Sequence, residues 1–325
     1  MSAAAFNTFL DNKHRLSWWE LTPFLVLAIL PFVARDYLPL ATQIIIYIIF
    51  TLSLDLLVGY AGIVTLGHAV FFGIGAYTAG IISVRGGWGE GLSGLLISAT
   101  ISGAAGVLFG SVVLRTARFT LLMLTLSAVF LANEIANKAS WITGGVDGLS
   151  GIDIWPLFGI FAFDMFGITG FIYALAALLV VWIFMRWLVH SPFGQSIAAI
   201  RDNRSRAAAI GIAVLPRLVV VYGISCAIAG FAGALQTQVI QFVGLKAASF
   251  ELSADVLIML AIGGAGRIYG AFLGPVIYLA AQDYFAKDDP VLWQLWLGLI
   301  VMAVATFARG GLMALLRRTA ASSAK

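Results

Sequence analysis

Long apolar runs, joined by short polar links, occupy most of the chain. The runs lie at residues 21–34, 37–84, 91–114, 119–133, 165–185, 218–245, 256–282 and 290–308. A helix that crosses a bilayer needs about 20 mostly apolar residues, so the second run is long enough for two helices. Glycines divide the run at 256–282 into two shorter pieces. The pattern therefore predicts an all-α, polytopic transmembrane bundle of ten segments, some broken or re-entrant, with eight or nine segments as alternatives.

The composition excludes a water-soluble fold. Hydrophobic residues make up 61% of the chain, charged residues make up 10%, and the mean hydropathy is +1.01. A soluble domain is about 45–50% apolar and about 25% charged, so we exclude a soluble enzyme, a disordered chain and a nucleic-acid-binding protein. The single cysteine, Cys226, cannot form an internal disulfide or a cysteine-based metal site, and we expect no bound metal.

The basic residues are distributed unevenly between the two sides that alternating segments define. If the loop at residues 188–216 is cytoplasmic, 14 of the 19 Lys and Arg residues fall on its side. The other five fall outside: Arg35, Arg85, Lys138, Lys246 and Lys287. By the positive-inside rule both termini are expected in the cytoplasm. We divide the chain into an N-terminal arm (1–20), a transmembrane domain (21–310) with an outer loop at 139–164, and a cytoplasmic tail (311–325).

Small residues form regular stripes in two of the apolar runs. In the run at 91–114 they recur every four residues, at Gly94, Ser98, Ser102, Gly106 and Gly110. The run at 218–245 carries a similar stripe, formed by Gly223, Ala227, Gly230 and Ala234. Helices in lipid associate by close packing, because lipid tails are as apolar as the side chains. These stripes therefore predict seams between helices and indicate nothing about cargo.

Two glycine clusters have an irregular spacing that does not fit a seam. They lie at residues 59–68 and 263–270. Irregular backbone at membrane depth is tolerated against protein or beside a water-filled cavity, and broken helices often line transport sites. A tight cytoplasmic turn between two short helices explains the second cluster at least as well. The candidates for the translocation path in these clusters are Gly59, Gly62, Gly67, His68, Gly263, Gly264 and Gly266.

Very few ionisable residues lie within the apolar runs. Asp55 is a further candidate for the translocation path, although a structural role as a hydrogen-bond acceptor for the broken segment nearby is favoured. For His68 a packing or capping role is favoured over ligand binding, because no His or carboxylate follows at i+3 or i+4. The chain also lacks a G-x-x-x-x-G-K-[ST] motif and any catalytic constellation. We therefore expect no enzyme activity, and an energy source on another subunit.

The loop at residues 188–216 is expected to contain a short amphipathic helix. Ser191 and Pro192 are typical of a helix start, with a capping hydroxyl followed by a proline at the first position. Phe193, Ile197 and Ile200 then fall on one helical face. Such a face can lie on anionic lipid, or it can dock a partner protein. The residues alone leave these two interpretations equal.

Several stretches share their order and spacing with one known family. They are G-Y-A-G through L-G-H-A-V-F-F-G-I-G-A-Y at 59–77, T-G-G-V-D-G-L-S-G-I at 143–152, and S-P-F-G through R-D-N to A-A-I-G-I at 191–212. G-G-A-G at 263–266 fits as well. On these motifs, which span roughly residues 37–282, the chain resembles the LivM-type permease subunits of bacterial ABC importers for branched-chain amino acids.

The resemblance implies a heteromeric importer in the bacterial inner membrane. Its partners would be a second, LivH-like permease, two cytoplasmic ATPase subunits that bind ATP and Mg²⁺, and a periplasmic amino-acid-binding protein. No cofactor is expected on this chain. The implied substrates are branched-chain or related hydrophobic amino acids, moved by alternating access; urea, short amides or aromatic acids are alternatives. An ion-coupled secondary carrier is a further, less favoured alternative.

The resemblance also assigns roles to two loops. The short helix would be a coupling helix seated on an ATPase, with Phe193, Gly194, Ile197, Ala198, Ala199, Ile200, Arg201, Asp202 and Gly211 as candidate residues. The outer loop would contact the binding protein, or else cap the bundle, through Thr143, Gly144, Gly145, Asp147 and Gly148. The general importer pattern E-A-A-x-x-x-G is degenerate here, since Ile197 replaces the acid and Asn203 the glycine. Docking details from other importers are therefore not transferred.

Overall fold

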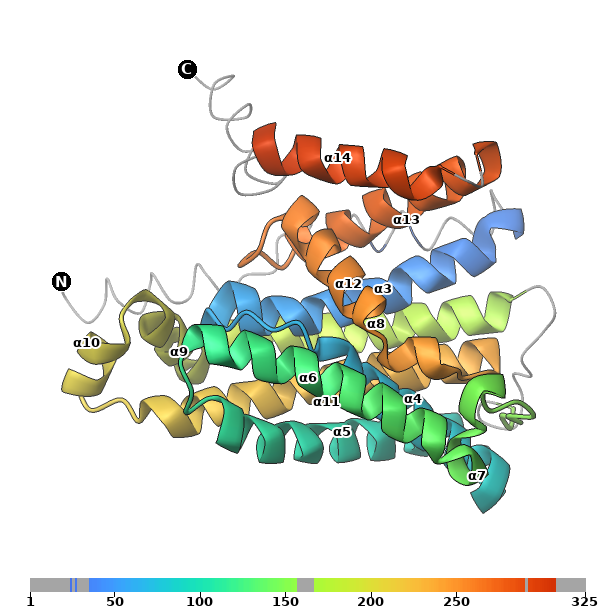
Figure 1. The fold of residues 1–325 in the computed structure, drawn as a ribbon, viewed down its shortest axis with the longest axis horizontal. Coiled ribbons are helices and arrows are strands. Elements are labelled where there is room, and N and C mark those ends of the chain that lie inside the picture. Colours follow the sequence, from blue (N-terminus) through green and yellow to red (C-terminus); the bar gives the residue numbers. More distant parts are fainter. Residues whose placement is uncertain (1–23, 25–26, 28–34, 157–166, 290–291, 308–325) are drawn as a thin grey trace.

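The computed structural model describes residues 24, 27, 35–156, 167–289 and 292–307 (Figure 1). The long helices are α3 (Leu38–Asp55), α4 (His68–Gly86), α5 (Gly91–Val113), α6 (Arg118–Lys138), α8 (Ile168–His190), α11 (Val214–Ile240), α12 (Phe250–Gly263), α13 (Gly270–Asp288) and α14 (Trp293–Phe307). The short ones are η2 (Arg35–Tyr37), η3 (Leu56–Ala61), α7 (Ser140–Thr143), η4 (Gly145–Asp147), α9 (Pro192–Asp202), α10 (Arg204–Ala209) and η5 (Leu245–Ala248). Among these residues the only β contact is an isolated bridge between Leu149 and Val243. The predicted all-α bundle is confirmed.

Six described helices are long and apolar enough to cross a membrane: α3 continued by η3, α4, α5, α6, α8 and α11. The helices α12, α13 and α14 contain 14, 19 and 15 residues. The predicted first segment lies outside the described residues except for Phe24 and Leu27, and so do the N-terminal arm and the C-terminal tail. The multi-pass architecture is confirmed, and the total of eight to ten spans stays a prediction.

The helices α3, α4 and α11 form the centre of the bundle, and α5 and α6 lie at its periphery. The most apolar window of α3 with η3 is 83% buried and that of α11 is 72% buried, against 28% for α5 and 22% for α6. Large apolar side chains on the peripheral helices, such as Leu108 and Phe119, point outward. Exposed apolar surface of this extent suits a lipid surrounding, in which such side chains cost nothing.

The predicted small-residue seams are confirmed, and they face each other across α5 and α11. All five stripe residues of α5 are buried. A Cβ atom added to Gly106 would lie 2.5 Å from Cβ of Cys226, and one added to Gly103 would lie 3.0 Å from Cβ of Ala227. The Ser102 hydroxyl donates hydrogen bonds to the carbonyls of Phe71 on α4 and Cys226 on α11. Three helices are thus held together by one small-residue stripe.

We expect Gly233→Ala to destabilise the protein. Gly233 lies on α11, where a Cβ atom would collide with the Phe72 carbonyl oxygen of α4, and a backbone carbonyl cannot move aside as a side chain can. The expected loss is about 2–3 kcal/mol, typical of overpacking in a core. Gly298→Ala on α14 is the matched control, since its Cβ would meet nothing within 4 Å, and Ala favours a helix over Gly by about 1 kcal/mol. Thermal unfolding of the purified protein in detergent compares them; equal midpoints for both variants would contradict the prediction.

The chain is broken between α3 and α4. After Asp55 the helix widens into the π-helix η3, which ends at Gly62 with φ of 68°. A π-helical turn within a longer helix is rare and often marks a functional site. Residues 62–67 then turn back into the bundle, where the Leu66 amide donates a hydrogen bond to the Thr125 hydroxyl of α6. The predicted break at the first glycine cluster is confirmed, and α4 begins inside the protein.

Candidate functional site

Basic residues gather at one end of the bundle. This end carries the loop after α8, the C-terminal ends of α3, α5 and α12, and the N-terminal ends of α6 and α11. The helices α9 and α10 form its tip (Figure 1). The described arginines on it are Arg115, Arg118, Arg186, Arg201, Arg204, Arg206, Arg217 and Arg267. The opposite end carries Arg35, Arg85, Lys138, Lys246 and Lys287. The two sets that alternation of the segments predicted therefore lie at opposite ends of the bundle.

The short helix of the loop begins where the sequence predicts. Ser191 is the N-cap of α9, and its hydroxyl accepts a hydrogen bond from the Gly194 amide at 3.2 Å. Pro192 occupies the first helical position, where its missing N–H is no loss. Gly194 packs against the last turn of α8, and a Cβ atom there would collide with the carbonyls of Leu188 and Val189. The connection between α8 and α9 is therefore rigid, which suits a helix whose displacement is transmitted to α8.

The apolar face of α9 is turned toward the bundle. Ile197 and Ile200 are 1% and 0% exposed within the core of this chain, and Phe193 is half-buried against it. The interpretation that this face docks a partner protein is therefore wrong for Ile197 and Ile200, because an amphipathic helix buries its apolar side wherever a complementary surface exists. These residues anchor α9 instead. Among the candidate residues of the loop, Arg201, Asp202 and Gly211 are exposed.

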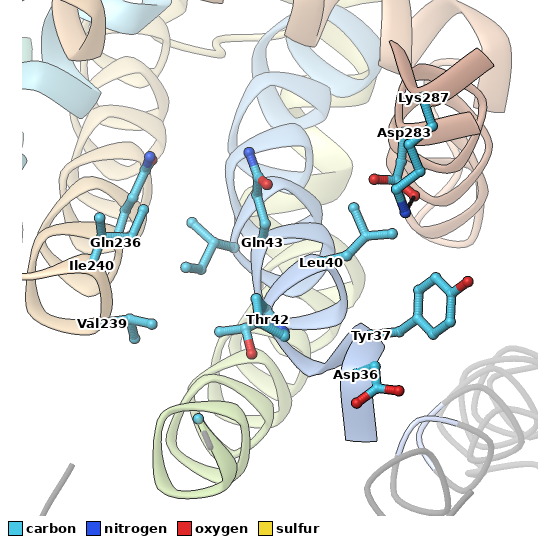
Figure 2. Close-up of a pocket in the computed structure, with 13 residues that line it drawn as sticks. Asp36, Tyr37, Leu40, Thr42, Gln43, Gln236, Val239, Ile240, Asp283 and Lys287 are labelled. Atoms are coloured by element: carbon cyan, nitrogen blue, oxygen red, sulfur yellow. Dashed lines mark hydrogen bonds and ion pairs between the residues drawn. The ribbon is translucent and has the colours of Figure 1, made fainter. Parts of the chain in front are cut away.

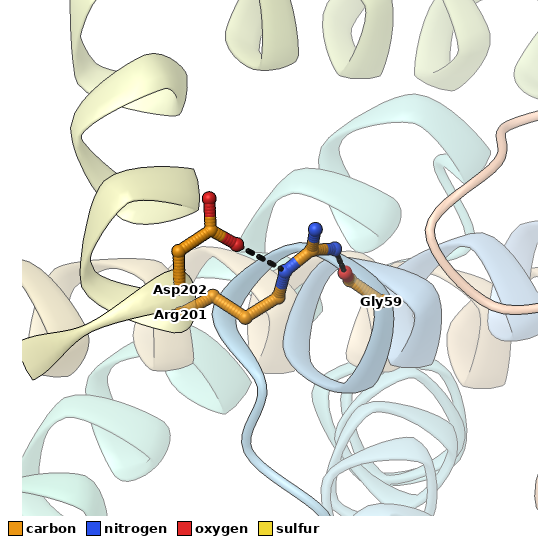
Figure 3. Close-up of polar contacts among 3 residues, drawn as sticks. All are labelled: Gly59, Arg201 and Asp202. Carbon is orange, nitrogen blue, oxygen red and sulfur yellow. Dashed lines mark hydrogen bonds and ion pairs between the residues drawn. The ribbon is translucent and has the colours of Figure 1, made fainter.

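Arg201 links the loop helix to the broken end of α3. Its Nη1 donates a hydrogen bond to the carbonyl oxygen of Gly59 in η3, and its Nε lies 3.6 Å from Oδ1 of Asp202 (Figure 3). Gly62 lies against the same side chain, since a Cβ atom on it would sit 2.8 Å from Cγ of Arg201. Gly59 lies near the C-terminal end of η3, where helix carbonyls lack partners within the helix. The side chain of Arg201 thus connects the loop motif at 191–212 with the first glycine cluster at 59–68.

Asp55 connects the second glycine cluster to the contact between Arg201 and Gly59. Its Oδ1 accepts a hydrogen bond from the Gly266 amide at 2.6 Å, and the side chain is fully buried. The expected structural role is present, but the donor belongs to the second cluster rather than to the segment nearest in sequence. Gly266 sits between Arg201 and Gly59, because a Cβ atom on it would lie within 3.4 Å of both. We call Asp55, Gly59, Arg201 and Gly266 the junction.

The second glycine cluster forms a turn between two short helices. The helix α12 ends at Gly263 and α13 begins at Gly270, and Gly264 and Gly266 have φ of 102° and 79°. Backbone of Gly263 and Gly270 is in such close contact that a Cβ on either would collide with the other. The interpretation as a tight turn between short helices is confirmed. Glycine is required here because the turn needs left-handed backbone and close approach together.

His68 lies deep in the bundle at the start of α4. Its Nε2 is 2.8 Å from the Ser53 hydroxyl and 3.5 Å from the Ser225 hydroxyl, and Phe50 stacks on its ring. The ring is 1% exposed and packs as a structural residue would. Among the residues that the structure describes, no group of three or more His, Cys, Asp or Glu side chains could hold a metal ion.

The outer loop is described up to residue 156. The Leu149–Val243 bridge attaches it to the segment that follows α11, and the Thr143 hydroxyl donates to the carbonyls of Ala136 and Ala139. Gly144, Gly145 and Gly148 all have positive φ, so they make the turns that fold this loop back on the bundle. Asp147 is exposed at its surface. Thr143 and Gly145 are buried, and they shape the loop rather than present a contact.

Two adjoining polar cavities open between α3, α11 and α13, and the sequence analysis did not predict them. The larger, shown in Figure 2, has a volume of about 740 Å³ and the smaller about 270 Å³, and Gln43, Gln236 and Ile240 line both. None of the glycines proposed for the translocation path lines either cavity, nor do Asp55 and His68. The feature of the sequence that could have indicated these cavities is Asp255. This carboxylate directly precedes the apolar run at 256–282 and lies in the second turn of α12.

Comparison with known proteins identifies the family. The family described as "Branched-chain amino acid transport system / permease component" matches residues 37–306. The high-affinity branched-chain amino acid transport system permease protein LivM of Salmonella typhimurium (strain LT2) is 30% identical over 91% of this chain and 75% of its own length. The LivM of Escherichia coli (strain K12) is 29% identical over the same shares.

A more distant relative shows the same family. The probable branched-chain amino acid transport permease protein LivM of Methanocaldococcus jannaschii is 24% identical over 73% of this chain and 77% of its own length. No solved structure matches. The relatives are transport permeases rather than enzymes. From the family match across most of the chain and the LivM relatives, the chain belongs to the permease components of branched-chain amino acid transport systems.

Proposed function

We propose that the protein is the LivM-type permease subunit of an ATP-driven importer, and that it translocates branched-chain or related hydrophobic amino acids. The partners are a second, LivH-like permease, two ATPase subunits that bind ATP and Mg²⁺, and a periplasmic binding protein. The family match and the relatives' names support this proposal. The absence of a P-loop from the sequence supports hydrolysis on another subunit.

The end of the bundle that carries α9 and α10 is cytoplasmic in this proposal. The gathering of arginines there supports it, because cytoplasmic loops of membrane proteins are enriched in Lys and Arg. The outer loop then faces the periplasm, where the exposed Val146 and Asp147 are available to the binding protein. In this proposal the protein lies in the bacterial inner membrane, with its ATPases on the arginine-rich side.

The junction carries the coupling in this proposal. The ATPase contacts the exposed side of α9 and α10, and the buried Ile197 and Ile200 make α9 move with the bundle rather than independently of it. Arg201 passes the displacement to Gly59 at the broken end of α3, and Gly266 passes it to the turn between α12 and α13. Discrete rearrangement of such packed elements is the usual basis of alternating access. The contact from Arg201 to Gly59 is the observation that carries the mechanism.

Reconstitution tests the proposed function. The complete importer in lipid vesicles is expected to accumulate labelled leucine only when ATP is present on the ATPase side and the loaded binding protein on the other. The permease pair without ATPases is expected to accumulate nothing under proton or sodium gradients. Accumulation by the permeases alone under an ion gradient would replace this proposal with a secondary carrier.

We expect Ile210→Asp to weaken ATPase association. Ile210 is 75% exposed at the end of α10, a position at which an isolated apolar side chain suits a partner's pocket. Loss of one such anchor is expected to lower the affinity for the ATPases about tenfold or more. The control is Val146→Asp, which makes the same change at a similarly exposed apolar residue at the opposite end of the bundle. Copurification of ATPases with each variant is the measurement, and equal recovery would exclude α10 as the docking element.

A further inference from the structure

The smaller cavity lies apart from the junction, since none of the junction residues lines it. Its volume is about 270 Å³, and its walls come from α3, α4, α11, α12 and α13 with the segment around η5. At one end it carries Lys246, which is exposed at the outer end of the bundle. At the other end it reaches Phe72, whose ring lies 4.6 Å from that of Phe50, the residue that stacks on His68. The cavity therefore extends from the outer end toward the middle of the bundle.

One wall of this cavity offers hydrogen-bond acceptors. The Tyr278 hydroxyl donates to Oδ1 of Asp255 at 2.6 Å, which fixes the carboxylate in place and uses only one of its several acceptor positions. The Oε1 atom of Gln236 is buried and has no hydrogen-bond partner among the described residues. An unpaired acceptor inside a protein is costly and calls for a ligand or an ordered water. A fixed carboxylate and an unpaired amide oxygen that line the same cavity suit an ammonium group.

The cavity also contains a positive charge. Lys246 lines it and acts electrostatically on Asp255, as does the exposed Glu251 one turn before Asp255. Within the described part of the chain, Lys246 and Asp255 do not form an ion pair with each other. A small site with separated charges of opposite sign suits a molecule that carries one charge of each sign.

The remaining wall is apolar. It is formed by side chains from α4, α12 and α13, namely Phe72, Leu252, Met259 and Leu279. Methionine adapts its shape to varied apolar partners. The cavity volume lies near the lower limit of about 300 Å³ for ligand pockets, so it suits a ligand smaller than most drugs. An aliphatic side chain of an amino acid would lie against this wall.

We propose that this cavity binds a zwitterionic amino acid with an aliphatic side chain on its way through the permease. Asp255 and Gln236 receive the ammonium group, Lys246 the carboxylate, and the apolar wall the side chain. Tyr278 is a positioning residue that holds Asp255. The adjoining cavity, which shares Gln43 and Gln236, is the approach to this site (Figure 2). The assignment of substrate class rests on the proposed function.

Cysteine protection tests the site without requiring transport. Ala247 is half-buried in the cavity wall, whereas the native Cys226 is fully buried and gives little background reaction. Millimolar leucine is expected to slow the reaction of purified Ala247→Cys with a small maleimide about threefold. Leucinol, which lacks the carboxylate, and 4-methylpentanoate, which lacks the ammonium group, are expected to give no protection. Absence of protection by leucine and by every other aliphatic amino acid would overturn the proposal.

The Asp255→Asn substitution supplies the residue test in the same Ala247→Cys background. Asn keeps an acceptor for Tyr278, so the local fold is retained, and about tenfold more leucine is expected for half protection. Lys246→Gln is expected to have a similar effect by loss of the carboxylate partner. The control, Glu134→Gln, removes a carboxylate from an exposed position of α6 that does not line the cavity, and is expected to leave protection unchanged. Equal protection in all three variants would overturn the assignment.

The two proposals fail in different ways. Protection that depends on Asp255, together with an assembled importer that shows no ATP-driven uptake, would uphold the site and reject the proposed function. ATP-driven leucine uptake without any protection at Ala247→Cys would uphold the proposed function and reject the site.

Discussion

Arg201→Ala is expected to uncouple the importer. The side chain is the hydrogen-bonded link between α9 and the π-helix at Gly59, so its loss leaves α9 attached while the broken end of α3 no longer follows it. Coupling free energies between sites commonly correspond to about 5–150-fold effects, and we expect leucine uptake to fall about tenfold or more. ATP hydrolysis by the associated ATPases is expected to continue. Uptake and hydrolysis are measured on the same vesicles, so that their ratio gives the coupling directly.

Two variants separate this effect from a change of charge. Arg118→Ala removes an exposed arginine at the same end of the bundle, at the start of α6 and outside α9 and α10, and is expected to keep uptake within about twofold of the unmodified protein, as surface substitutions generally do. Arg201→Lys keeps the charge but supplies an ammonium in place of a planar fork, and is expected to restore only part of the uptake. If Arg201→Ala transports as well as Arg118→Ala does, the junction has no part in coupling.

Asp55→Leu is expected to abolish transport by releasing the turn between α12 and α13. The substitution removes the acceptor for the Gly266 amide and leaves a buried N–H unpaired, at a cost of about 1–3 kcal/mol. Leucine is apolar and similar in size, so the helix itself is expected to remain packed in the bundle. Hydrogen exchange of residues 263–270 is expected to accelerate, and uptake in the assembled importer to be lost.

Asp55→Asn is the matched control for this prediction. Its side-chain oxygen can accept the same hydrogen bond, so it is expected to keep slow exchange at residues 263–270 and most of the uptake. If Asp55→Leu matches Asp55→Asn in both measurements, the bond to Gly266 has no role in transport. If both variants lose uptake while exchange stays slow, the negative charge of Asp55 matters rather than its hydrogen bond.

Local rules were enough to predict the helices, their seams and the start of α9. Apolar length predicts a spanning helix, four-residue spacing of small residues predicts close contact, and Ser191 with Pro192 predicts a helix start. Each of these rules depends on residues within one or two helical turns. The structure agrees with them, because the neighbouring helices reinforce those local preferences rather than override them.

The assembled sites could not be predicted in the same way. Arg201 and Gly59 are 142 positions apart, and Asp55 and Gly266 are 211 apart, so only the packing of whole helices brings them together. The burial of Ile197 and Ile200 within this chain was not predicted, for a related reason. An amphipathic face indicates that it will be buried, but it does not indicate whether the covering surface belongs to the same chain.

The cavity residues show the same limit. Gln43, Gln236 and Asp255 lie on three different helices, so the sequence does not bring them together. The translocation-path candidates that we named in the sequence were glycines, Asp55 and His68. The neutral amides were missed because only glycines and ionisable residues were considered.

The start of α4 inside the bundle has a consequence for how the protein is made. The Ala69 amide donates to the Ser253 hydroxyl, and the Ser53 carbonyl at the same depth accepts from the Ser225 hydroxyl. Unpaired backbone groups are not tolerated in lipid, yet these partners leave the ribosome more than 150 residues later. During synthesis the segment that precedes α4 therefore has to stay out of the lipid, within the translocation machinery or near the membrane surface, until α11 and α12 are inserted. Truncation before α11 should leave a chain that quality-control proteases recognise as unfinished.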